Sequence, residues 1–387
     1  MTVLLLTIIY AAFVSLGLPD ALLGAAWPVM GQEFQVPVSY AGAISVTISV
    51  GTVTASLLSQ RLTNRFGTGT VTAVSVAMTA LALLGFSFTR SYQMMFLWAI
   101  PFGLGAGGVD AALNNYVALH YASRHMSWLH CMWGVGASLG PYIMGWALAG
   151  EGWNMGYRCI AFLQMGLSAV LFLSIPLWRK NTATDTLGKK TSQNVTLGLR
   201  EIVAIPGAKE VFVAFFCYCA AEQTAILWAS TYLVRHLGMM EERAATLASL
   251  FFIGITVGRA ANGFLTYKLD DKALIRLGEG IMVLGLLVML LPLGALSSTA
   301  GLLLLGLGCA PIYPCIIHST PVLFGAEKSQ AIIGVQMASA YIGALATPPV
   351  FGLVANHISA SLLPFFIGGI TLMMICMCEG LNRKRAL

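Results

Sequence analysis

Apolar runs of about twenty residues recur along the whole chain, which leaves little polar surface for a soluble fold. Of its 387 residues, 58% are hydrophobic and only 9% are charged. A helix needs about twenty apolar residues to cross a bilayer. The sequence therefore predicts an all-α membrane protein with many transmembrane helices.

Glycine, proline and charge clusters divide the chain into twelve predicted spans. They cover residues 3–29, 40–60, 69–89, 93–120, 127–149, 158–178, 209–234, 245–266, 275–296, 299–319, 329–354 and 361–380. The first run lacks the basic n-region of a signal peptide and continues through Trp27 with an acid inside it. We therefore expect it to be a transmembrane helix.

Lysine and arginine are distributed unequally between the two sides of the predicted bundle. With both termini on one side, that side receives sixteen of the 21 basic residues, and Arg259 lies inside a span. The opposite side receives Arg90, Arg158, Arg235 and Arg243. The positive-inside rule predicts cytoplasmic termini and a cytoplasmic central loop, in a bacterial inner membrane. This topology explains the net charge of +6 without a nucleic-acid partner.

Three glycine pairs occur in the same order in the two halves of the chain. Offsets of 203, 203 and 207 residues separate Gly51 from Gly254, Gly103 from Gly306, and Gly136 from Gly343. Near-constant offsets indicate a parallel duplication. The predicted domains are an N-terminal six-helix bundle at 1–178, a polar cytoplasmic linker at 179–208 and a C-terminal six-helix bundle at 209–387.

Three carboxylates lie inside predicted spans: Asp20, Asp110 and Glu222. An ionised carboxylate at the bilayer centre costs about 2.5–3.5 kcal/mol, so such residues are usually functional. A carboxyl group in a low-dielectric cavity can hold a proton at neutral pH and release it when the cavity opens to water. Neutralisation by a proton, or by sodium, would bias two alternating states. The three acids are therefore candidates for ion coupling.

Enzyme and metal-site signatures do not appear in the sequence. The eight cysteines form no CxxC pair and no His/Cys cluster at metal-ligand spacing, which predicts reduced, buried thiols and neither metal nor cofactor. The chain has no G-x-S-x-G, H-E-x-x-H, P-loop or dinucleotide fingerprint. We expect no enzymatic activity and no ATP-driven pumping, which leaves ion gradients as the energy source.

Twelve spans in a six-plus-six repeat with a basic central loop resemble the major facilitator superfamily. The loop after the second span, Arg61-Leu-Thr-Asn64-Arg65-Phe-Gly67, is similar to that superfamily's D-R-x-G signature, with Asn64 in place of the aspartate. By this resemblance Arg65 is a candidate gating or structural residue.

Three further segments resemble the fucose:proton symporter family. They are Gly17-Leu-Pro-Asp20-Ala-Leu-Leu-Gly24, Gly105-Ala-Gly107-Gly-Val-Asp110-Ala-Ala-Leu-Asn114-Asn115 and Leu129-His130-Cys-Met-Trp-Gly134. The resemblance implies that Asp20 and Asp110 bind sugar and transfer protons, with Asn114 beside them. We add Asn115 as a candidate substrate contact, although the family often has proline there.

Helical spacing leads to similar residues without the family. Asp110 and Asn114 are four positions apart, so they share a helix face on which a carboxylate and an amide can bind vicinal hydroxyls. The alternative is an acid buried for structure alone. Pro19 breaks the helical ladder beside Asp20, which could instead serve as a cap for the broken helix.

The second half contributes further candidates by repeat position. Glu222 is the approximate counterpart of Asp20 at an offset of 202, and by resemblance it faces the cavity. The candidate substrate contacts are Gln223, Trp228, Tyr313 at the repeat position of Asp110, and His318 at that of Asn115. His318 could equally be an ordinary residue at a helix end.

Two basic residues have open roles. His130 could serve a proton path or gate, but we favour a hydrogen bond that ties the fourth and fifth spans together. Arg259 could balance the charge of Glu222, but we favour a structural role in which its side chain snorkels toward the cytoplasm.

We therefore expect a monomeric transporter in the lipid bilayer that imports a sugar or similar polar solute with protons by alternating access. Three alternatives remain at this point: sodium coupling at the same site, export of a drug or metabolite in exchange for protons, and a receptor that binds without transport.

Overall fold

The computed structural model describes residues 2–20, 22–36, 40–186, 197–239, 244 and 247–386. Within these ranges the chain is helical and contains no strand, which confirms the predicted all-α class. Residues 187–196 of the predicted linker, with Lys189 and Lys190, lie outside the described residues, as does Arg243.

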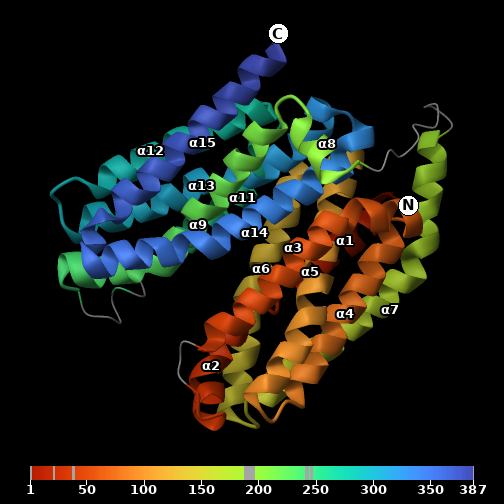
Figure 1. Ribbon diagram of the computed structural model, residues 1–387, viewed down its shortest axis with the longest axis horizontal. Coiled ribbons are helices and arrows are strands. Elements are labelled where there is room, and N and C mark those ends of the chain that lie inside the picture. The colour runs from red at the N-terminus through yellow and green to blue at the C-terminus, as the bar shows by residue number, and fades with distance from the viewer. Residues whose placement is uncertain are drawn as a thin grey trace. The chain divides into compact units, whose positions relative to one another are not determined.

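Each of the twelve predicted spans overlaps a helix, and the first span is divided into two (Figure 1). The helices up to the predicted linker are α1 (Thr2–Gly17), α2 (Leu22–Glu33), α3 (Ala41–Phe66), α4 (Thr68–Ser87), α5 (Tyr92–His120), α6 (Ser123–Ala149) and α7 (Trp153–Thr186). The later elements are α8 (Leu199–Ala204), α9 (Ala208–Leu237), α11 (Leu250–Leu265), α12 (Asp271–Met289), α13 (Ala295–Phe324), α14 (Ala326–His357), η2 (Ala360–Leu362) and α15 (Leu363–Ala386).

The break between α1 and α2 lies at Pro19. Proline has no backbone N–H and cannot continue the helical ladder. The amide of Asp20 donates to the carbonyl of Gly17 at 3.1 Å, and the amide of Leu22 donates to that of Pro19 at 3.1 Å. Each of these hydrogen bonds closes a tight turn of four residues, so the carboxylate of Asp20 lies at a helix break inside a predicted span.

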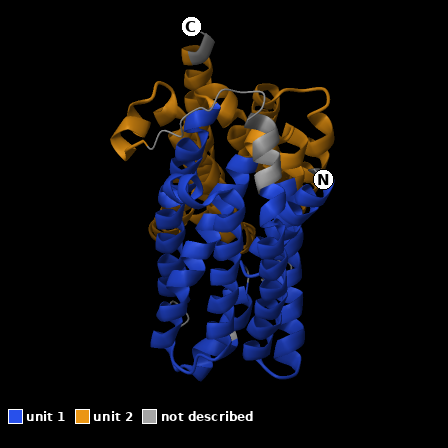
Figure 2. Ribbon diagram, turned by 90° about the vertical axis from the view of Figure 1, so that its right-hand side faces the viewer, with its two compact units in different colours: residues 1–116, 129–196, 326–338 blue, residues 117–128, 197–325, 339–387 orange. Residues whose placement is uncertain are grey.

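The described structure divides into two compact units (Figure 2). Unit 1 contains residues 1–116, 129–196 and 326–338, and unit 2 contains residues 117–128, 197–325 and 339–387. Unit 1 thus includes the first turns of α14, and unit 2 includes the end of α5 and the start of α6. Each half of the sequence contributes one short segment to the unit built mainly from the other half.

Close helix contacts repeat at the offset of the sequence duplication. In unit 1, a Cβ added to Gly103 on α5 would overlap the backbone carbonyl of Ile48 on α3. In unit 2, a Cβ added to Gly306 on α13 would overlap the backbone carbonyl of Phe251 on α11. Both residues of the second pair lie 203 positions after those of the first. Only glycine allows the two backbones to approach so closely.

A second pair of close glycine contacts is also repeated in the two halves of the sequence. Gly136 on α6 lies against the carbonyl of Val14 on α1, and Gly343 on α14 lies against the carbonyl of Phe216 on α9. The equivalent pairing of helices supports the duplication that the glycine offsets predict.

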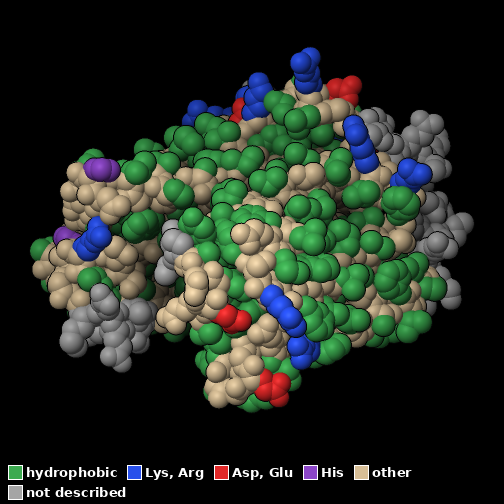
Figure 3. All heavy atoms as spheres, turned by 60° about the horizontal axis from the view of Figure 1, so that its bottom comes forward, with side chains coloured by type: hydrophobic (Ala, Val, Ile, Leu, Met, Phe, Trp, Pro, Cys, Tyr) green, Lys and Arg blue, Asp and Glu red, His purple; other side chains and the backbone are tan. Residues whose placement is uncertain are grey.

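The surface is strongly apolar, as a bilayer requires. In the part of the chain that the structure describes, nine helices are long and apolar enough to cross a membrane, and α11 is a shorter apolar helix. Hydrophobic side chains cover most of the face in Figure 3, with few charged side chains among them. Leu173 on α7 and Val322 on α13 are more than four-fifths exposed. Such large exposed apolar surface is stable against lipid tails.

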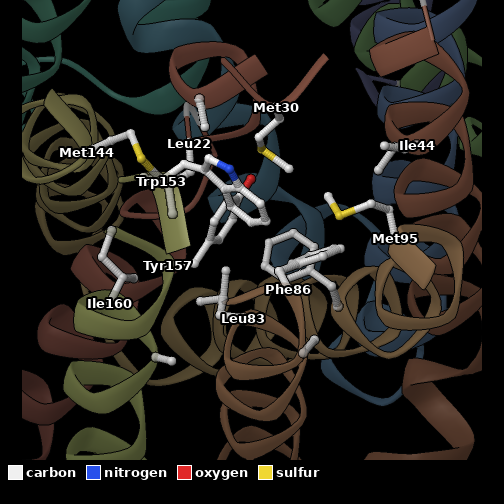
Figure 4. Close-up of a cluster of buried hydrophobic side chains, with 14 of the residues drawn as sticks. Leu22, Met30, Ile44, Leu83, Phe86, Met95, Met144, Trp153, Tyr157 and Ile160 are labelled. Carbon is white, nitrogen blue, oxygen red and sulfur yellow. The ribbon is translucent and has the colours of Figure 1, made fainter. Parts of the chain in front are cut away.

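A dense apolar core in unit 1 anchors α2 (Figure 4). Leu22 and Met30 of α2 pack with Phe86 of α4 and with Trp153 and Tyr157 of α7. The Trp153 indole also donates a hydrogen bond to the carboxylate of Glu33 at 2.6 Å. This core fixes the helix that follows the Pro19 break and so positions Asp20.

Candidate functional site

Asp110, Asn114 and His130 form a hydrogen-bonded chain in unit 1, which we call the Asp110 cluster. The side-chain amide of Asn114 donates to the Asp110 carboxylate at 2.7 Å and to the Asp110 carbonyl at 2.9 Å. His130 Nε2 lies 3.0 Å from Asn114 Oδ1. Asn114 uses its amino group on Asp110, so His130 is the donor in the second bond. The chain ties α5 to α6.

The Asp110 cluster is buried. The exposed fractions are 4% for Asp110, 0% for Asn114 and 5% for His130. The ring of His130 also packs edge-on against Phe13 of α1, with ring centroids 5.4 Å apart. Asn114, at the centre of the chain, therefore orients Asp110 and is itself shielded in this conformation.

Asp20 differs from Asp110 because it is exposed on unit 1. Its carboxylate accepts a hydrogen bond of 2.7 Å from the indole N–H of Trp133 on α6. The backbones of α1 and α6 approach closely here, since a Cβ on Gly17 would overlap the Trp133 carbonyl. The helix break and this close approach together fix the position of the Asp20 carboxylate.

The two acids of unit 1 differ in exposure. Asp110 is buried and Asp20 is exposed, and both lie inside predicted spans. Two carboxyl groups that interact titrate as a pair, so a proton bound at one changes the affinity of the other.

Tyr218, Glu222 and Arg259 form a second group in unit 2, which we call the Glu222 cluster. The Glu222 carboxylate accepts a hydrogen bond from the Tyr218 hydroxyl at 2.9 Å and lies 3.1 Å from the guanidinium of Arg259. Arg259 is only 3% exposed. The prediction that its side chain snorkels toward the cytoplasm is therefore wrong: the buried carboxylate of Glu222 holds it between α9 and α11.

Aromatic rings line one side of the Glu222 cluster. Tyr313 on α13 packs against Phe215 and Tyr218 on α9, with ring centroids 4.6 and 5.8 Å apart. Tyr313 is half-buried. Such a ring can pack against the apolar C–H face of a solute while its hydroxyl makes a polar contact.

The other two candidates on α9 lie beyond Glu222. The Trp228 indole donates to the carbonyl of Pro348 on α14 at 2.8 Å, and its ring packs against Phe351 with centroids 5.7 Å apart. Its polar atom is thus already used within unit 2. Gln223 is half-buried.

The remaining candidates contact residues outside the two clusters. Asn115 Oδ1 accepts a hydrogen bond of 2.6 Å from Ser329 on α14, within unit 1. His318 on α13 contacts the carboxylate of Asp271 on α12, within unit 2. Arg65 is exposed at the end of α3, with its guanidinium 5.3 Å from the centroid of the Phe66 ring.

Sequence reasoning missed three side chains that complete these groups. Trp133 lies in the motif that carries the family resemblance, and Tyr218 precedes Glu222 by one helical turn. Those positions could have identified both as partners of the acids. Asp271 is a charged residue at a helix start, where the sequence indicates only solvent exposure.

A model of the Major Facilitator Superfamily matches residues 5–316 and 211–381. Bypass of stop codon protein 6 of Saccharomyces cerevisiae is 24% identical over 284 residues, which cover 67% of this chain and 56% of that protein. The glucose/mannose transporter GlcP of Bacillus subtilis is 22% identical over 327 residues, which cover 81% of this chain and 79% of that protein.

Solved structures share the fold. The crystal structure of the Escherichia coli fucose:proton symporter superposes with a TM-score of 0.73 at 16% sequence identity, covering 97% of this chain and 98% of the symporter. The expected twelve-helix fold and the resemblance to this superfamily are thus confirmed.

Proposed function

This chain belongs to the Major Facilitator Superfamily, and we propose that it imports a sugar or sugar-like polar solute together with protons by alternating access. Proteins of this family are transporters and not enzymes. The chain is therefore an integral membrane protein that carries a small-molecule substrate, as the sequence predicts.

The proposal depends most on the Asp110 cluster. A carboxylate that is 4% exposed inside a span is costly when ionised, and the amide of Asn114 donates a hydrogen bond to it. Protonation removes that cost but weakens the hydrogen bond from Asn114, which is then no longer charge-assisted. Such a group can bind and release a proton in each transport cycle.

Asp20 and Trp133 supply the surface for the solute in this proposal. An exposed carboxylate inside a predicted span is stable only toward water, so we infer that Asp20 faces an aqueous cavity. A carboxylate beside an indole ring can bind a hydroxyl group and an apolar sugar face at the same time. The glucose/mannose transporter among the relatives supports this substrate class.

The cycle follows from the coupling of the two acids. Protonation of the Asp20–Asp110 pair from outside permits the solute to bind, and loss of the proton to the cytoplasm favours its release. In unit 2, the Glu222 cluster forms a fixed charge pair, and Tyr313 packs beside it.

The proposal includes a topology. The distribution of lysine and arginine supports cytoplasmic termini, and we assign the chain to a bacterial inner membrane as a monomer.

The test is uptake of labelled hexoses, deoxyhexoses and amino sugars into proteoliposomes with an imposed pH gradient. We expect concentrative uptake that a protonophore abolishes and that needs no sodium. Uptake that requires sodium would retain the site and change the ion. No uptake of any sugar would contradict the substrate class, and export of apolar cations would then be measured.

A further inference from the structure

His318 connects three elements at one end of unit 2. Its Nδ1 atom lies 2.5 Å from the carboxylate of Asp271, the first residue of α12. Its Nε2 atom lies 3.2 Å from the backbone carbonyl of Tyr121, which follows α5. The other Asp271 oxygen accepts a hydrogen bond from Ser123 at the start of α6. We call Tyr121, Ser123, Asp271 and His318 the ionic latch.

Both ring nitrogens of His318 face hydrogen-bond acceptors. A neutral imidazole donates from one nitrogen only, whereas the imidazolium donates from both. Loss of the proton therefore leaves either the Asp271 carboxylate or the Tyr121 carbonyl without its donor. Only the protonated ring can donate to both acceptors at once.

The Asp271 carboxylate faces one ring nitrogen of His318, and Asp271 is the first residue of α12. The ionic latch is largely buried, because the side chains of His318 and Asp271 are 17% and 15% exposed. Their charge interaction is therefore screened less than that of a surface pair.

Other titratable groups of the described residues lie close to the ionic latch. The thiol of Cys315 on α13 interacts with Asp271. His125 on α6 packs edge-on against the Tyr121 ring, with centroids 5.6 Å apart. Partial burial and the neighbouring charge of Arg124 lower the pKa of His125, which lies before the predicted fifth span. His125 is thus mainly neutral near pH 7 and is not the source of the latch charge.

The duplication gives the ionic latch an uncharged counterpart. His318 lies 203 positions after Asn115, and Ser329 lies 206 positions after Ser123. In unit 1, Ser329 at the start of α14 donates to Asn115 at the end of α5 at 2.6 Å. We call this pair the neutral latch. The start of α14 thus joins the end of α5 without a titratable group, whereas the connection between α5 and α6 joins α12 and α13 through a histidine.

We propose that His318 and Asp271 form a proton-binding site that locks the connection between α5 and α6 onto α12 and α13. The lock is stable while His318 carries its proton and weakens as the pH rises. This site depends on the proposed function only for its physiological meaning. With the proposed topology it lies on the cytoplasmic side, where loss of the proton would help the transporter open inward.

Hydrogen–deuterium exchange of the purified full chain between pH 5 and pH 9 tests the lock. The measured quantity is protection of residues 117–128 relative to that of residues 326–338, which contain one residue of the neutral latch. This ratio removes the intrinsic pH dependence of exchange. In the unmodified protein we expect relative protection to fall about tenfold as the pH rises, the effect of losing one charge-assisted hydrogen bond.

His318→Gln should abolish this pH dependence, because glutamine cannot gain a proton. Ser329→Ala is the matched control: it should lower protection of residues 326–338 at every pH and leave the pH-dependent change at residues 117–128 in place. His125→Gln should also retain it.

A flat ratio in the unmodified protein would overturn the proposal, and that measurement needs no variant. An unchanged pH dependence in His318→Gln would overturn it as well. The exchange experiment requires no solute, so a transporter of some other substrate would still give the expected pH dependence. Failure of the sugar assay and failure of the ionic latch are therefore distinguishable.

Discussion

The Asp110 cluster and the Glu222 cluster each contain a buried acid inside a predicted span, but they balance its charge differently. Glu222 lies 3.1 Å from the guanidinium of Arg259, so one charge compensates the other. Asp110 accepts a hydrogen bond from the neutral amide of Asn114. A carboxyl group buried inside a span gains from binding a proton, because burial penalises its charged form. We therefore propose that proton coupling belongs to unit 1 and that the charge pair of unit 2 is fixed.

The largest expected effect is the loss of coupling in Asp110→Asn. The amide keeps an acceptor for Asn114 but cannot bind and release a proton. We expect accumulation against a gradient to disappear in proteoliposomes while exchange of labelled for unlabelled solute continues. Accumulation that persists in this variant would assign the coupling proton to another group.

Substitutions in the Glu222 cluster should lower the stability of the folded protein. Removal of one member of a buried ion pair leaves an uncompensated charge, which typically costs about 3–5 kcal/mol. We expect Glu222→Gln and Arg259→Met each to lower the unfolding midpoint of the detergent-purified protein by many degrees. The double variant should lose much less than the sum of the two.

The double variant also tests the comparison directly. If the charge pair is static, proton-driven accumulation should remain in every molecule of the double variant that folds. Loss of coupling with normal folding would show that Glu222 belongs to the proton path, and the two clusters would then share one role.

His130→Phe should have a smaller effect on the Asp110 cluster. Phenylalanine leaves Asn114 Oδ1 buried without its donor, which costs about 1–3 kcal/mol. Because Asn114 also orients Asp110, the pH optimum of transport should move in His130→Phe. His130→Gln, which restores a donor, should recover most of the stability. An identical pH profile in the unmodified protein, His130→Phe and His130→Gln would show that His130 contributes only to packing.

The fold followed closely from the sequence, because apolar length and glycine offsets are local and repeated signals. Pro19 predicted the helix break, and Asp110 with Asn114 predicted a shared helix face. The predicted snorkelling of Arg259 was wrong because it was based on the sequence distance to the next lysine. That distance does not indicate which helix packs beside Arg259. Glu222 lies 37 positions earlier in the chain and comes into contact only through packing of α9 on α11. The Asp271–His318 contact was missed for the same reason.

The smallest expected effect concerns Trp133, the donor to the exposed Asp20. Trp133→Phe removes one hydrogen bond of 2.7 Å and keeps most of the aromatic surface, so the loss should be about 0.5–1.5 kcal/mol. We expect the apparent KM for the solute to rise up to about tenfold with little change in the maximal rate. Trp228→Phe is the matched control, because its indole donates to the Pro348 carbonyl and not to an acid. Trp133→Phe and Trp228→Phe could instead have equal effects on KM and on the pH dependence of KM. That result would contradict the proposal that only unit 1 responds to protons.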